Sequence, residues 1–170
     1  MRKLFILAPL ALLGTTPPEA APIAQTAAAQ AGVDYDGFVE LAGELGEFRD
    51  GRLLGWQDWR SRANQPGAII LDTRSAAAFA DGHIEGAVNL PFSDFTDAKL
   101  AGIIPDPDTP VFIYCNNNFA DDVPPVPLKR LELALNIPTF INLYGYGYTN
   151  IYELDGVVFL DQVDWVSSAG

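Results

Sequence analysis

The stretch AIILDTRSAAAFADGHIEGAVNLP, residues 68–91, decides the fold. Its first four residues, 68–71, are all apolar, which is typical of a strand buried on both faces. Ser75 suits the N-cap of a helix over residues 76–80. Residues 87–90 read as a second short strand, which Pro91 ends. Strand, helix and strand in this order predict parallel strands joined by a helical crossover.

The alternation continues on both sides of this stretch. Apolar spacing predicts helices around residues 38–45 and 56–63, and another over residues 94–103. Residues 111–114 (VFIY) form the most apolar strand, and Cys115 follows it directly. In parallel α/β sheets, ligands bind beyond the carboxyl ends of the strands. Cys115 is therefore the first candidate for a functional side chain.

The last part of the chain is expected to repeat the pattern. Pro127 suits the first turn of a helix that runs to about Asn136, and residues 139–143 (TFINL) are expected to form a strand. The whole chain is therefore expected to be an α/β protein, with a central parallel sheet and helices on both faces.

The N-terminus resembles an export signal. Arg2 and Lys3 precede a short apolar run at residues 4–13, which is too short to span a bilayer. Residues 1–28 are interpreted as a signal peptide or flexible leader, and a buried or interfacial segment is the alternative. We expect a periplasmic or secreted protein with no membrane span after signal removal.

Composition limits the possible functions. The 170 residues are 49% hydrophobic and carry a formal net charge of −12, which fits one globular domain and disfavours nucleic-acid binding. One cysteine and one histidine exclude an intramolecular disulfide and an ordinary structural zinc site. We expect no metal and no cofactor.

Two parts of the sequence resemble the signatures of a known family. Residues 71–75 (LDTRS), followed by residues 82–91 (GHIEGAVNLP), are similar to the first signature of the rhodanese-like family. The strand ending at Cys115 is similar to the second element, and residues 143–147 (LYGYG) look like the family's strand and Gly-rich loop. The resemblance identifies residues 33–170 as a rhodanese-like domain.

This resemblance implies a sulfurtransferase. The catalytic cysteine, here Cys115, would accept a sulfur atom as a persulfide and pass it to an acceptor, so its thiolate must be stabilised. The expected partners are a small sulfur-containing anion or a protein persulfide. The backbone N–H groups expected to hold the anion belong to the loop after the strand: Asn116, Asn117, Asn118, Phe119 and Ala120.

The loop departs from the pattern of active members, which carry cations and a glycine. It contains no Arg, Lys or Gly, which also argues against the related Cys-x5-Arg phosphatases. Asp121 and Asp122 follow, and they are expected to raise the pKa of the thiol and to repel anionic donors. We therefore expect a neutral, amide-built cradle and a neutral or protein-bound persulfide as donor.

Three other residues are expected to support the site. Asp72 and Arg74 should organise the strand end by hydrogen bonds and an ion pair, although alanines occupy the usual place of the arginine's acidic partner. Lys129, with Arg130, either folds back to supply the missing cations or is a solvated helix residue. His83 is expected to be a structural turn residue.

Two further functions remain open. A non-catalytic binding module would use the Asn-rich loop at residues 116–118 and a Tyr-rich loop at residues 144–148, where the tyrosines are equally expected to be packing residues. A redox-sensing thiol is the other alternative.

Overall fold

A parallel sheet forms the centre of the domain in the computed structural model, which describes residues 32–167. Its five strands have the order β1-β6-β5-β2-β4, and every neighbouring pair is parallel. The strands are β1 (Leu53–Leu54), β2 (Ile69–Asp72), β4 (Ala87–Asn89), β5 (Val111–Tyr114) and β6 (Ile151–Leu154). The α/β class with a central parallel sheet is thereby confirmed. The expected signal peptide at residues 1–28 lies outside the described residues.

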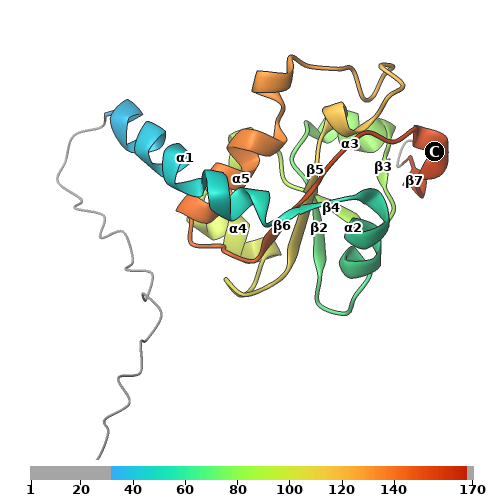
Figure 1. The fold of residues 1–170 in the computed structure, drawn as a ribbon. Helices are drawn as coiled ribbons and strands as arrows, with labels where there is room; N and C mark the ends of the chain where they lie inside the picture. Colours follow the sequence, from blue (N-terminus) through green and yellow to red (C-terminus); the bar gives the residue numbers. More distant parts are fainter. Residues whose placement is uncertain (1–31, 168–170) are drawn as a thin grey trace, which may run out of the picture. The chain divides into compact units, whose positions relative to one another are not determined.

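Helices cover both faces of this sheet (Figure 1). One face carries α1 (Tyr35–Asp50), α4 (Asp97–Ile103) and α5 (Asn136–Gly145), and the other carries α2 (Trp56–Ala63). The remaining elements are α3 (Ala76–Asp81), four 3₁₀ turns, η1 (Phe92–Asp94), η2 (Asn116–Asn118), η3 (Leu131–Leu133) and η4 (Leu160–Gln162), and an antiparallel pair of β3 (His83–Ile84) with β7 (Trp165–Val166). Within residues 32–167, no helix has the length and apolar character needed to cross a membrane.

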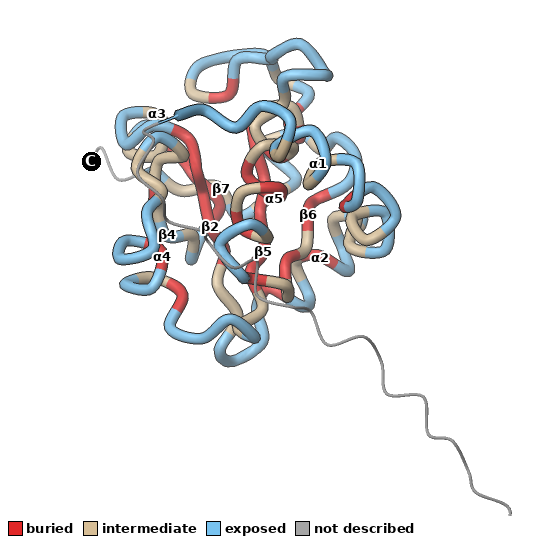
Figure 2. Tube along the Cα trace, turned by 90° about the vertical axis from the view of Figure 1, so that its left-hand side faces the viewer, coloured by how far each residue is buried: buried red, intermediate tan, exposed pale blue. Residues whose placement is uncertain are grey.

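The two cores follow from the alternation of side chains along the strands. Leu71 and Ile113 point into the core under α4 and α5, whereas Ile70 and Phe112 point into the core that α2 covers through Trp59. All five side chains are almost fully buried. Figure 2 shows burial concentrated along the central strands. The prediction that the apolar runs are doubly covered strands is confirmed.

A capping residue sets the start of helices α3 and α4. Ser75 Oγ accepts the backbone N–H of Ala78 and so begins α3 as expected. The helix expected over residues 94–103 begins instead at Asp97, because Thr96 caps it by accepting the N–H of Lys99.

The two elements expected after Pro127 are wrong. No α-helix begins at Pro127: an irregular segment containing the short turn η3 leads to α5. Residues 139–143 lie within α5 rather than in a strand, and residues 143–147 form the end of that helix and the turn after it. The last strand of the sheet is β6 instead. The apolar positions 137, 140, 141 and 144 have helical spacing, which the apparent strand pattern of residues 139–143 concealed.

Candidate functional site

Cys115 lies at the carboxyl end of β5, the middle strand of the sheet. It stands immediately before η2 in extended backbone and is 2% exposed. Ligands of parallel α/β sheets bind at this edge.

Backbone N–H groups from two parts of the chain affect the thiol. Hydrogen bonding by those of Asn136, Asn117 and Leu135 lowers the pKa of the Cys115 thiol. Asn136 and Leu135 stand at the N-terminus of α5, whose partial positive charge also favours a thiolate. Burial and the nearby carboxylate of Glu153 act in the opposite direction, and burial is the largest effect, so the pKa is raised overall.

Part of the expected loop cradle has other hydrogen-bond partners. The N–H groups of Asn118, Phe119 and Ala120 donate to the backbone carbonyls of Cys115, Asn116 and Val158. Of the predicted loop donors, Asn117 is the one whose N–H is among the main causes that lower the thiol pKa. Leu135 and Asn136 were missed because they lie far along the chain. Pro138, which suits the first turn of a helix, was the local signal for a helix start there.

The two aspartates after the loop, Asp121 and Asp122, are not among the main causes that shift the pKa of Cys115. Asp121 accepts the N–H of Leu160 and Asp122 accepts the N–H of Leu128, so both carboxylates hold loop backbone. The thiol pKa is raised as expected, but by burial and by Glu153.

The three asparagine side chains anchor the loop. Asn118 Oδ1 accepts the N–H of Cys115 at 2.9 Å, and its Nδ2 donates to the carbonyl oxygens of Leu154 and Gly156. Asn117 bonds both the N–H and the carbonyl of Lys129, at 3.1 and 2.8 Å. Their amide hydrogens thus go to backbone carbonyls, and the neutral side-chain cradle expected from the sequence is not what they build.

Asn116 differs from its two neighbours. Its Nδ2 donates to the carbonyl of Pro127 at 3.0 Å, but its Oδ1 is buried without a hydrogen-bond partner. Together, the amides of residues 116 and 117 tie the cysteine loop to residues 127–129 and so bring Lys129 beside the thiol.

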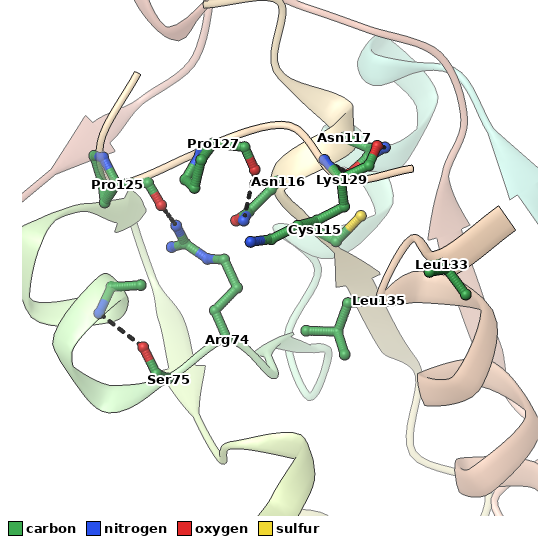
Figure 3. A pocket seen from close by; sticks show the side chains of 11 residues that line it. Arg74, Ser75, Cys115, Asn116, Asn117, Pro125, Pro127, Lys129, Leu133 and Leu135 are labelled. Carbon is green, nitrogen blue, oxygen red and sulfur yellow. Dashed lines mark hydrogen bonds between the residues drawn. The ribbon is translucent and has the colours of Figure 1, made fainter. Parts of the chain in front are cut away.

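Cys115 opens onto a cavity of about 400 Å³ that we call the Lys129 cavity. Its other lining residues include two cations and a set of apolar side chains: Arg74, Ser75, Ala78, Asn116, Asn117, Pro125, Pro127, Lys129, Leu133 and Leu135. In Figure 3, the side chain of Lys129 extends across this cavity. Within residues 32–167, Lys129 forms no ion pair. Although the loop itself lacks cations, the pocket does not.

Arg74 is held in place by a buried network. Its guanidinium bonds both oxygens of Asp72, at 2.6 to 3.1 Å, and donates to the carbonyls of Gly82 and Pro125. Tyr114 donates its hydroxyl to Asp72 at 2.6 Å. The acidic partner that seemed missing from the sequence is therefore Asp72 itself. Burial and the Asp72 charge raise the pKa of Tyr114, which stays protonated.

A second cavity, of about 220 Å³, also reaches Cys115, and we call it the Glu153 cavity. Its charged lining residues are Glu153, Asp155 and Arg49. Arg49 bonds both oxygens of Glu153 at 2.7 Å, and this contact is the largest cause that raises the pKa of Arg49. Glu153 was missed at the sequence level, although a carboxylate within the apolar run IYEL was a signal for a functional position.

The other singled-out residues are structural. Tyr148 is in the core, Tyr144 packs its ring on Phe48, and neither lines a cavity at Cys115. Tyr144 and Tyr148 are therefore packing residues, whereas Tyr146 is exposed, and a binding role for the Tyr-rich loop stays a prediction. His83, as expected for a turn residue, is buried; its Nδ1 bonds the carbonyl of Phe79, on whose ring it also stacks.

Comparison with known proteins agrees with this architecture. The family model of the rhodanese-like domain matches residues 56–158, and the chain belongs to this family. A curated relative, the tRNA uridine(34) hydroxylase of Chlamydia abortus, is 29% identical over 126 residues. This match takes in 71% of the present chain but 34% of the relative, so the chain spans about a third of that protein's length.

Two solved structures match the chain, and the first of them is similar to it in fold. The BH2092 protein of Bacillus halodurans matches with a TM-score of 0.51 and 14% identity, over 79% of this chain and 87% of that one. The polysulfide-sulfur transferase homodimer of Wolinella succinogenes matches with a TM-score of 0.40 and 16% identity, over 76% of this chain and 85% of that one.

Proposed function

We propose that this protein is a sulfurtransferase in which Cys115 accepts a sulfane sulfur as a persulfide and passes it to an acceptor. The observation that carries the proposal is the place of Cys115: at the end of β5, next to the N-terminus of α5, on a cavity that contains Arg74 and Lys129. Membership of the rhodanese-like family supports it.

The cavity charges favour an anionic donor over the neutral one expected from the loop sequence. Lys129 is unpaired within the described residues, and Arg74 lies beside it. A small anion such as thiosulfate or a polysulfide is attracted to such a site, and N–H groups at a helix N-terminus favour the negative charge.

The test is persulfide formation on Cys115. The full chain is incubated with thiosulfate or polysulfide, and the intact mass is measured before and after treatment with a thiol. The proposal predicts an added sulfur atom that the thiol removes and that the Cys115→Ser variant never acquires. Absence of the adduct with both donors overturns it.

A non-catalytic binding module is the competing function. The observation that favours it is the low exposure of the thiol, whose raised pKa keeps it protonated at neutral pH. A sluggish thiol with no adduct, together with retained partner binding by Cys115→Ser, would support this function.

The tRNA chemistry in the name of the Chlamydia relative is not carried over to this chain. A net charge of −12 opposes binding to a phosphate backbone, and the match covers a third of that relative.

We also propose export to the periplasm or the medium, on the basis of Arg2, Lys3 and the apolar residues 4–13. Cell fractionation after expression of the full chain tests this. Recovery of an unprocessed chain in the cytoplasm alone would contradict it.

A further inference from the structure

Cys115 lines two cavities, and Asn117 also lines both. The turn η3 contributes a different side chain to each: Leu133 lines the Lys129 cavity, whereas Leu131 lines the Glu153 cavity. Glu153 lines the second cavity together with Cys115, and its carboxylate is close enough to raise the pKa of the thiol. In Figure 3, the sulfur points away from Arg74. A group attached to the sulfur therefore has two directions open to it.

The two cavities carry opposite charge. In the Lys129 cavity, Asp72 neutralises the charge of Arg74, and the ammonium of Lys129 is left as the net positive charge. In the Glu153 cavity, Arg49 and Glu153 neutralise each other as an ion pair, and the carboxylate of Asp155 is left as the net negative charge. The first cavity attracts anions and the second repels them.

We infer that the two cavities separate the two half-reactions: an anionic sulfur donor loads Cys115 through the Lys129 cavity, and a neutral or cationic thiol discharges it through the Glu153 cavity. The inference rests on the proposed function and names the class of acceptor. It also predicts that cyanide and other anions are poor acceptors.

Both steps balance without a further reagent. In loading, the Cys115 thiolate attacks the outer sulfur of thiosulfate, the sulfur–sulfur bond of the donor breaks, and sulfite leaves with the bonding electron pair. Before discharge, the outer sulfur of the persulfide takes up a proton from solvent, and the acceptor thiol loses its proton to solvent. The acceptor thiolate then attacks the protonated outer sulfur, the bond between the two persulfide sulfurs breaks, and the Cys115 thiolate leaves with the electron pair.

The first test uses two matched variants, Leu131→Trp and Leu133→Trp. Both side chains are largely exposed, at 77% and 70%, and belong to the same turn, so a larger side chain fills the adjoining cavity without entering a core. Loading by thiosulfate and discharge to 2-mercaptoethanol are measured separately in single turnovers by intact mass. We expect Leu133→Trp to slow loading and Leu131→Trp to slow discharge, each by at least about fivefold, with the other step changed less than twofold.

The second test alters charge. Lys129→Gln keeps the backbone that Asn117 binds, and it should slow loading by thiosulfate by roughly threefold or more. Asp155→Asn should speed discharge to the anion 3-mercaptopropionate by a similar factor and leave discharge to 2-mercaptoethanol unchanged. Arg130→Gln and Glu132→Gln are the controls, because Arg130 precedes η3 and Glu132 lies within it, but neither lines a cavity.

The outcomes separate this inference from the proposed function. If the unaltered protein never acquires a sulfur atom, the proposed function fails and the inference falls with it. If the unaltered protein loads and discharges, but both Trp variants slow the same step or neither slows any step, the division of the two steps is refuted. An equal response of anionic and neutral acceptors to Asp155→Asn also refutes it.

Discussion

Replacing each loop asparagine by alanine in turn should produce a steep gradient in stability, with Asn118 at its top. Asn118 is 6% exposed and uses its whole amide. Its Oδ1 accepts the N–H of Cys115 and the Nδ2–H of Asn136, and its Nδ2 donates to the carbonyls of Leu154 and Gly156. Each bond contributes about 1 kcal/mol net, so Asn118→Ala should reduce the free energy of unfolding by about 4 kcal/mol. That is a large part of the roughly 5–15 kcal/mol of a typical domain.

The other two asparagines are the matched controls. Asn117 makes two bonds, both to the backbone of Lys129 and both open to solvent, and its loss should cost about 1 kcal/mol or less. Asn116 makes one bond, to Pro127, and its Oδ1 is buried without a partner, so Asn116→Ala removes an unfavourable burial along with that bond. This substitution should change the free energy of unfolding by less than about 0.5 kcal/mol.

Urea denaturation of the three variants, followed by tryptophan fluorescence, measures these differences. Asn118→Asp adds a second check, because its carboxylate keeps the acceptor oxygen but places negative charge against two carbonyl oxygens. At neutral pH this variant should be as destabilised as Asn118→Ala, and protonation of the carboxylate in acid should restore part of the lost free energy of unfolding. A cost below about 1 kcal/mol for Asn118→Ala, or a cost equal to that of Asn117→Ala, would refute the role assigned to this amide.

Three further predictions follow from the same structure. The folded-state pKa of Cys115 lies above that of an unfolded thiol, so the protonated thiol stabilises the fold below about pH 8.5, and this contribution is lost as the pH rises further. The rate of alkylation by iodoacetamide should therefore still increase at pH values where the rate for a free thiol has levelled off, and an earlier plateau would contradict this. Tyr114→Phe removes the 2.6 Å bond to Asp72 and should lower the free energy of unfolding by about 1–3 kcal/mol in urea titration, whereas an unchanged midpoint would count against the network. In Gly82→Ala, the new Cβ would clash with Nε1 of Trp165, so the indole must move. We expect a shifted tryptophan emission and a decrease of about 1–3 kcal/mol in the free energy of unfolding, and an unaltered spectrum and Tm would contradict this.

The central strands were predictable because their sequences are compatible with only one type of secondary structure. Residues 68–71 and 111–114 are short apolar runs bounded by turn residues, and a run of this kind is stable only where both faces are covered. The position of Cys115 follows from the second of these strands. The cap at Ser75 was equally local and equally clear.

The segment after Pro127 was not predictable in the same way, because its sequence allows two readings. Residues 139–143 satisfy a strand pattern, whereas positions 137, 140, 141 and 144 satisfy a helical one. The helix forms because Phe140 and Leu143 then pack against the apolar face of β2 and β5, which would otherwise be open to water. Only long-range packing chooses between the readings.

The sequence by itself determined the family, the buried strands and the cysteine at the end of β5, since these depend on runs of neighbouring residues. Only the tertiary structure decided what surrounds the sulfur: the N–H groups of Leu135 and Asn136, the ammonium of Lys129 and the carboxylate of Glu153 all come from distant parts of the chain. The physical reason is that electrostatic and hydrogen-bonding effects depend on distance in space, which local sequence patterns do not contain.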